Sequence, residues 1–167
     1  MLPSPSIVVF DSTWLNDSQA NSHRPLLEQI LADPRLKIYG FSLFEAEAIK
    51  TQSDRFTEQI RPVTPAQDIA SLNPALIILD PMLSIGQGMI DLMRGTRLFI
   101  WIKQQPAFAK LPIIFITDIN VDPEDKRNFQ TCGLVDVFNW QQLRHDSIGF
   151  KSVVTNIFVA HQHKTTP

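Results

Sequence analysis

The sequence predicts an α/β fold built on a doubly wound, five-stranded parallel sheet. Five short apolar runs alternate with segments whose apolar residues recur at helical spacing. Right-handed connections between parallel strands place helices over both faces of such a sheet. The chain has 167 residues, 44% hydrophobic content and a formal net charge of −2. These values are typical of one globular domain spanning residues 1–167.

Each expected strand is an apolar run followed by polar or turn-forming residues, and each is short enough to be fully buried. In chain order the five strands are Ile7–Phe10, Leu36–Phe41, Leu76–Leu79, Pro112–Thr117 and Leu134–Phe138.

The helices are indicated by periodicity and by capping residues. Asp122-Pro123-Glu124 is typical of a helix start, with an N-cap, a first-turn proline and an early acid. Helical spacing marks the first helix by Leu26, Leu27, Ile30 and Leu31, and the last helix by Phe150, Val153, Val154, Ile157 and Phe158.

The third helix, about Met89 to Gln104, contains five consecutive apolar residues from Leu98 to Ile102. Consecutive residues on a helix point in all directions, so some of these side chains face away from the sheet. We expect an insertion at about 45–65, between the second and third strands, to cover them. The alternative is a surface for a partner or for self-association. A short helix is expected at Gln67–Leu72, after the insertion, and a polar tail at 160–167.

Several classes of protein are disfavoured by composition. The single Cys132 excludes an internal disulfide framework and a multi-cysteine metal site. No apolar run approaches the roughly 20 residues of a membrane span, and the first residues lack the features of a signal peptide. The basic residues are scattered, which disfavours nucleic-acid binding. We therefore expect a cytoplasmic protein that binds neither membranes nor nucleic acids.

Polar residues follow four of the strands. They are Asp11 and Ser12, Asp80, Thr117 and Asp118, and Asn139 and Trp140. The carboxyl ends of parallel strands share one edge of the sheet, where doubly wound folds place their functional residues. We expect these side chains to meet there, with Asp80 at the centre.

At these positions the chain resembles the receiver domain of two-component response regulators, the CheY-like group of flavodoxin-like folds. Asp80 stands at the phosphoacceptor position and Gly88 follows eight residues later. Thr117 closes the strand Pro-Ile-Ile-Phe-Ile-Thr, Gly133 opens the fifth strand, and Asp11 ends the first. The resemblance covers nearly the whole chain.

The resemblance implies phosphoryl transfer from a histidine kinase to Asp80, with Mg²⁺ bridging the acids. Asp11, Asp80 and the backbone carbonyl of Met82 correspond to the metal ligands, and Thr117 corresponds to the switch hydroxyl. Mg²⁺ requires oxygen ligands in octahedral geometry, and the phosphoryl oxygens require nearby positive charge.

Four positions depart from the family pattern. Ser12 replaces the second acid, and Trp140 replaces the lysine that pairs with the phosphoacceptor. Asp118 adds a carboxylate where a small residue is usual, and Val137 replaces the switch aromatic. Lys126 and Arg127 could reach the site only by an unusual rotamer. Mg²⁺ binding should therefore be weak.

These features favour a stand-alone receiver-like signalling domain, a pseudo-receiver with weakened or lost phosphorylation, which acts through protein contacts. It is not expected to be an enzyme beyond autophosphorylation and autodephosphorylation at Asp80. The expected partner is a histidine kinase or a downstream effector. A homodimer could form through the face of the fourth helix, fifth strand and fifth helix, or through the apolar third helix.

Two alternatives remain open. One is a functional Mg²⁺-dependent phosphoacceptor at Asp80, and the other is a flavodoxin-like domain that binds a small ligand at the same edge. The four histidines, His23, His145, His161 and His163, are assigned no chemistry.

Overall fold

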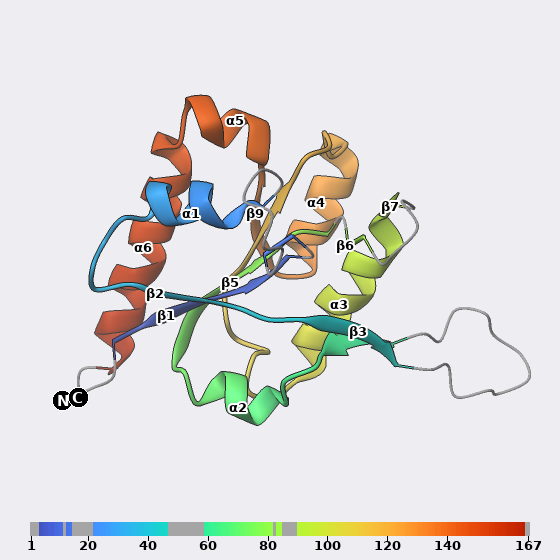
Figure 1. Cartoon of the computed structure of the whole chain (residues 1–167), viewed down its shortest axis with the longest axis horizontal. Helices are drawn as coiled ribbons and strands as arrows, with labels where there is room; N and C mark the ends of the chain where they lie inside the picture. Colours follow the sequence, from blue (N-terminus) through green and yellow to red (C-terminus); the bar gives the residue numbers. More distant parts are fainter. Residues whose placement is uncertain are drawn as a thin grey trace, which may run out of the picture.

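The computed structural model describes residues 4–11, 13–14, 22–46, 59–81, 83–84 and 90–165. At its centre lies a five-stranded parallel sheet in the order β2-β1-β5-β8-β9 (Figure 1). The strands are β1 (Ser6–Phe10), β2 (Lys37–Gly40), β5 (Pro74–Leu79), β8 (Ile113–Thr117) and β9 (Leu134–Asn139). The predicted doubly wound parallel sheet is confirmed.

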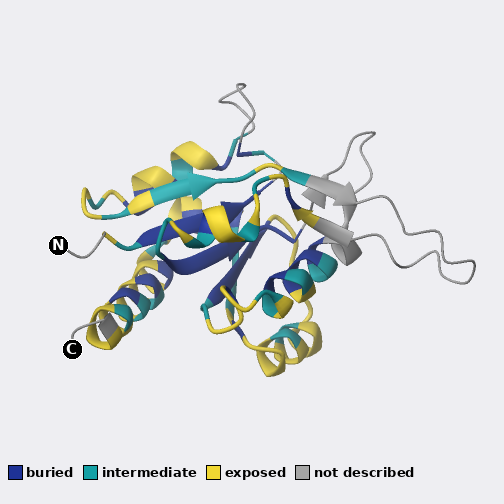
Figure 2. Ribbon diagram, turned by 90° about the horizontal axis from the view of Figure 1, so that it is seen from below, coloured by how far each residue is buried: buried dark blue, intermediate teal, exposed yellow. Residues whose placement is uncertain are grey.

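Helices cover both faces of the sheet, so the central strands are buried between two apolar layers (Figure 2). One layer contains α1 (Arg24–Ile30), α5 (Trp140–His145) and α6 (Ile148–Thr165). The other contains α2 (Ala66–Ala70), α3 (Leu92–Gln104) and α4 (Pro123–Thr131).

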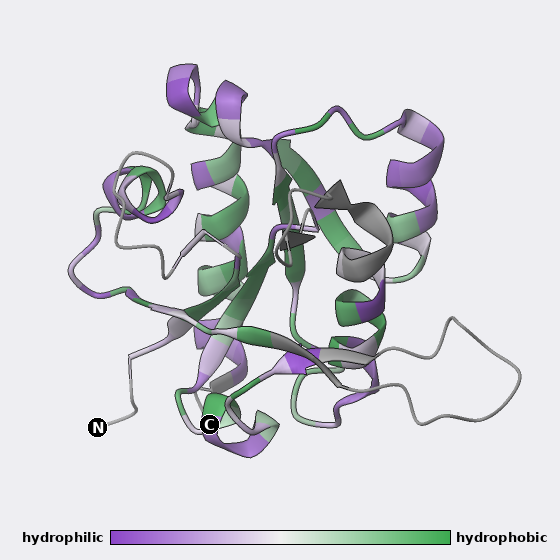
Figure 3. Ribbon diagram, turned by 45° about the vertical axis from the view of Figure 1, so that its right-hand side comes forward, coloured by the Kyte–Doolittle hydropathy of each residue, from purple (hydrophilic) through white to green (hydrophobic). Residues whose placement is uncertain are grey.

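Side chains along β1 alternate between the two apolar layers. Ile7 and Val9 pack in the layer of α1 and α6, whereas Val8 and Phe10 pack in the layer of α3. All four side chains are fully buried. The central strands are accordingly continuous apolar ribbons, and polar residues lie on the outer helix faces (Figure 3).

The segment predicted as an insertion contains an antiparallel strand pair, β3 (Leu43–Ala46) with β4 (Gln59–Pro62). Residues 47–58 lie outside the described part. β4 contacts α3, and Leu43 packs against the core layer that includes Leu98 and Ile102. This contact agrees with the expectation that the inserted segment covers the third helix. Ile100 nevertheless remains 49% exposed, so the cover is partial.

Four of the helices differ from the sequence predictions. α3 begins at Leu92 rather than Met89, because β7 (Ile90–Asp91) first pairs with β6 (Leu83–Ser84). The unexpected helix α5 follows β9 directly, because the Asn139 side chain accepts hydrogen bonds from the backbone amides of Gln141 and Gln142. α2 spans Ala66–Ala70 rather than Gln67–Leu72. α6 continues to Thr165, so residues 160–165 of the expected tail are helical.

Among the described residues, no helix combines the length and the apolar character that a membrane span requires.

The close approach of α3 to the chain after Asp80 requires a glycine at position 95. A methyl group there would overlap the backbone of Pro81, including its carbonyl oxygen. We expect Gly95→Ala to lower the free energy of unfolding by about 1–3 kcal/mol, because backbone must shift to admit the methyl group.

Urea unfolding of Gly149→Ala is the matched control. Gly149 also lies in a helix, but nothing lies within 4 Å of its added methyl group. Helix propensity then predicts an unchanged or slightly higher stability, by up to about 1 kcal/mol. Equal effects of the two substitutions would contradict the packing argument.

Candidate functional site

The carboxyl ends of β1, β5, β8 and β9 converge as predicted. Phe10 and Leu79 are paired in the β1–β5 register, so the next residues, Asp11 and Asp80, lie side by side. The Asp80 amide donates a hydrogen bond to the Phe10 carbonyl at 2.9 Å. Asp11 and Asp80 are buried, with 3% and 4% exposure. Two carboxylates therefore lie below the surface at the position that the sequence indicated.

A histidine that the sequence reasoning left without a role lies against these carboxylates. His23 Nδ1 is 2.6 Å from Asp11 Oδ2 and 3.7 Å from Asp80 Oδ2. Its Nε2 lies 3.2 Å from Asp118 Oδ2, at the end of β8. The sequence pattern indicated no chemistry for His23, yet its ring lies within 3.7 Å of three carboxylates.

Thr13 orients the same group from the other side. Its amide and its hydroxyl donate to Asp11 Oδ1 at 2.7 and 2.8 Å, and its hydroxyl accepts a hydrogen bond from the His23 amide. The side chain of Asp11 is thus held by backbone and side-chain donors on one oxygen and by imidazole on the other.

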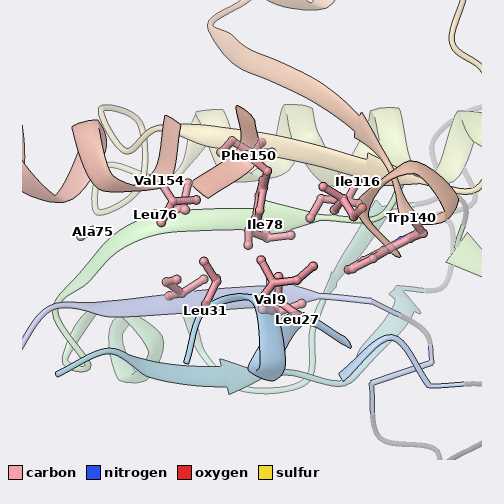
Figure 4. Packing of buried hydrophobic residues seen from close by; sticks show 14 of the residues in the cluster. Val9, Leu27, Leu31, Ala75, Leu76, Ile78, Ile116, Trp140, Phe150 and Val154 are labelled. Carbon is pink, nitrogen blue, oxygen red and sulfur yellow. The ribbon is translucent and has the colours of Figure 1, made fainter. Parts of the chain in front are cut away.

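Trp140 is the fifth member of what we call the His23 site, which comprises Asp11, His23, Asp80, Asp118 and Trp140. Its indole Nε1 donates to Asp80 Oδ2 at 3.0 Å. Its ring stacks on the His23 ring, with centroids 4.2 Å apart and planes 14° from parallel. Trp140 is fully buried and belongs to the core cluster of Val9, Leu27 and Ile116 (Figure 4). It is therefore both a core residue and a donor to Asp80.

The electrostatics of the His23 site favour the imidazolium form. Burial lowers the pKa of His23, but the hydrogen bond to Asp11 and the charges of Asp11, Asp80 and Asp118 together raise it above its ordinary value. Both ring nitrogens face carboxylate oxygens, which can only accept hydrogen bonds. A doubly protonated ring satisfies both contacts at once, so the geometry and the raised pKa of His23 both favour the charged form.

The resemblance implies Mg²⁺ at Asp11 and Asp80, so the fit of the donor set matters. Ligand atoms of Asp11, His23 and Asp80 all lie within 4.8 Å of one another, close enough to hold a metal ion. Mg²⁺, however, prefers oxygen ligands in near-ideal octahedral geometry. Here an imidazole nitrogen lies against both carboxylates, so the described side chains do not fit Mg²⁺ as they are arranged. Ser12, Met82 and Gly88 lie outside the described residues.

The other residues predicted for the site have different surroundings. Thr117 is fully buried, and its hydroxyl accepts a hydrogen bond from the Ile119 amide at 3.3 Å. Lys126 forms an ion pair at 2.7 Å with Asp136, which belongs to β9, instead of with a residue of the His23 site. Val137 packs in the layer of α3 and α4, away from the His23 site.

The position of His23 could have been predicted from the topology of the fold, although not from the periodicity of the sequence. His23 is the N-cap residue of α1. The helix that follows a parallel strand begins at the carboxyl edge of the sheet, because the crossover must return from there. A residue at the start of α1 is therefore expected at the carboxyl edge of the sheet, where Asp11 also lies.

Comparisons with known proteins were made by sequence and by structure. No protein-family model matches this sequence, and no curated protein matches it. The solved structures that share the fold include the following two. A response regulator from Desulfuromonas acetoxidans aligns with a TM-score of 0.53 and 16% identity, over 93% of this chain and 98% of that one. The signal receiver domain of a Luxo repressor protein from Vibrio parahaemolyticus aligns with a TM-score of 0.55 and 17% identity, over 96% and 94%.

The raised pKa of His23 makes the stability of the protein depend on pH. The stabilisation from His23 should be fully present below its unfolded pKa of about 6.5 and lost as pH rises through the higher folded value. We expect the difference in free energy of unfolding between wild type and His23→Gln to shrink over that range. Urea unfolding at several pH values measures it.

His145→Gln is the control, because His145 is exposed on the short helix α5. It should leave the pH profile of unfolding as in wild type. A wild-type profile that runs parallel to that of His23→Gln across the whole range would contradict the assignment of His23 as the cation.

The hydrogen bond from Trp140 to Asp80 can be isolated by a double-mutant cycle. Trp140→Phe keeps an aromatic ring but removes the donor, and it should cost about 1–3 kcal/mol in the free energy of unfolding. In an Asp80→Ala background the same substitution should cost less, because the acceptor is gone. A coupling energy near zero would show that the indole contributes by packing alone.

Proposed function

Because the chain has the fold of response-regulator receiver domains, we propose that it is a signalling domain of the two-component type in which Asp80 is no longer an effective phosphoacceptor. In this proposal the domain works through protein contacts rather than by turning over a substrate. A pseudo-receiver of this kind retains the surfaces of the fold, whereas its phosphorylation chemistry is weakened or lost.

The observation that carries the proposal is the set of contacts at Asp80. Oδ2 accepts a hydrogen bond from the Trp140 indole and lies 3.7 Å from the His23 ring. Only 4% of Asp80 is exposed. Attack by this oxygen on a phosphoryl donor would require the indole hydrogen bond to break and two stacked rings to move.

Charge balance argues in the same direction. An aspartyl phosphate would add negative charge beside Asp11 and Asp118, and the described site offers one cation, His23, which is already bonded to both. An indole donates one hydrogen bond but carries no charge. Weak Mg²⁺ binding is part of this proposal, since the imidazole lies where the carboxylates would otherwise bridge a metal ion.

The partners in this proposal are a histidine kinase or a downstream effector, or a second copy of the chain. The α4–β9–α6 face is one candidate surface, and Val135 on β9 is 37% exposed there. The apolar helix α3, with Ile100 exposed, is the other. In this proposal a partner binds one of these surfaces while His23 and Trp140 hold the buried carboxylates in one arrangement.

Treatment with acetyl phosphate or beryllium fluoride in the presence of Mg²⁺ tests the proposal. Intact mass should show no stoichiometric phosphoryl adduct, and backbone NMR should show no change at Asp80 or Thr117 with beryllium fluoride. An adduct that Asp80→Asn abolishes would establish the alternative, a functional Mg²⁺-dependent phosphoacceptor.

A second arm tests the reason for the loss. The double variant His23→Gln, Trp140→Lys removes the imidazole and places an amine near Asp80, and it should gain phosphorylation by acetyl phosphate with Mg²⁺. Its matched control is His23→Gln, Trp140→Phe, which opens the site but adds no cation and should stay unmodified. If both variants are folded and neither is modified, these two residues are not what prevents the reaction.

A further inference from the structure

A cavity lies at the amino-terminal edge of the sheet, opposite the edge that carries Asp80. It has a volume of about 490 Å³, within the range of small-molecule sites. Ala75 and Pro112 line it at the starts of β5 and β8, and Gly133 lines it just before β9. The last turns of α6 close its side. The carboxyl-terminal ends of α3 and α6 both point to this edge, away from α5 (Figure 1).

Three lysines from separate elements line this cavity. Lys103 belongs to the last turn of α3, Lys110 to the loop before β8, and Lys164 to the last turn of α6. No carboxylate is among the described residues that line the cavity. Within the described part of the chain, none of these three lysines forms an ion pair. The protein as a whole has a formal net charge of −2, so this edge differs in sign from the rest of the molecule.

The ammonium group of Lys103 lies against backbone that lines the cavity. Its Nζ lies 3.5 Å from the Leu111 carbonyl and 3.2 Å from where a Cβ on Gly133 would stand. Its side chain is partly buried, and burial alone lowers the pKa of its ammonium group. A desolvated cation without a counter-ion is unfavourable, and a bound anion would relieve that cost.

Helix ends explain only part of this arrangement. Cations in the last turn of a helix offset its negative end, which accounts for Lys103 and Lys164 separately. It does not account for Lys110, which lies in a loop, or for the presence of all three lysines at one cavity.

We propose that this cavity binds a phosphorylated small molecule that carries two or more negative charges and an apolar or aromatic group. Lysine ammonium groups bind phosphate as point charges, each with three donors. Leu111, Pro112 and Ile157 provide apolar wall for the remainder of the ligand. A nucleoside diphosphate has this combination of groups. The cavity does not include Asp80, so a test of ligand binding there is independent of the proposed function.

Titration of the full chain with ADP and with inorganic pyrophosphate, followed by backbone NMR at about 150 mM salt, tests the proposal. At that ionic strength, distant surface charges are largely screened. Saturable shifts should centre on the amides of Ala75, Leu111 and Gly133 for both probes, with tighter binding of ADP. Adenosine alone should bind at least tenfold more weakly than ADP.

The double variant Lys103→Gln, Lys164→Gln should weaken ADP binding by at least tenfold while the remaining amide spectrum stays that of the folded protein. Lys37→Gln, which removes an exposed charge from β2 outside the cavity, is the matched control and should bind as wild type. The proposal is overturned by an absence of saturable shifts at millimolar probe. It is equally overturned by shifts that the double variant and Lys37→Gln reduce alike, or by shifts centred on the edge that carries Asp80.

Discussion

The contact of the His23 ring with Asp11, Asp80 and Asp118 is the interaction on which the carboxyl edge of the sheet depends. The parallel pairing of β1 and β5 places Asp11 and Asp80 side by side. Both are buried, so little solvent screens the repulsion between their charges. Two like charges within 4.8 Å of one another repel by on the order of 3 kcal/mol at an effective dielectric constant of 20. A buried cation is the direct remedy. His23 provides it from the start of α1, and in doing so it ties that helix to the ends of β1 and β8.

Trp140 connects this edge to the hydrophobic core. One side of the indole stacks on His23, its nitrogen bonds to Asp80, and the remainder packs with Val9 and Leu27. Any event that moves Asp80 must therefore disturb core packing as well as a hydrogen bond. The same residue begins α5, whose N-terminus Asn139 caps. The arrangement links the state of the site to the position of β9 and of the helices that follow it, which is the part of the fold proposed to meet a partner.

Much of the fold follows from patterns that are local in sequence. The strand from Leu76 to Leu79 is too short and too apolar to be anything but buried, and Asp122-Pro123 starts a helix where the structure has α4. The errors lie where local signals are weak. α5 depends on a side-chain cap from Asn139 that is only recognisable once β9 is known to end there. The polar residues after Phe158 gave no apolar period, yet helix formation continues through them because an exposed face needs none.

The sequence by itself determined the chain order of the five parallel strands and the placement of Asp11 and Asp80 side by side at one edge of the sheet, because each depends on residue type and on a topological rule that admits one arrangement. Only the tertiary structure decided what surrounds Asp80. His23 lies 57 positions before Asp80 along the chain, and Trp140 lies 60 positions after it. Whether an imidazole and an indole meet one carboxylate depends on side-chain directions and on the path of the first loop, which no local pattern encodes. Trp140 could be singled out in the sequence, whereas the contact of His23 with Asp11 and Asp80 became visible only when the chain was folded.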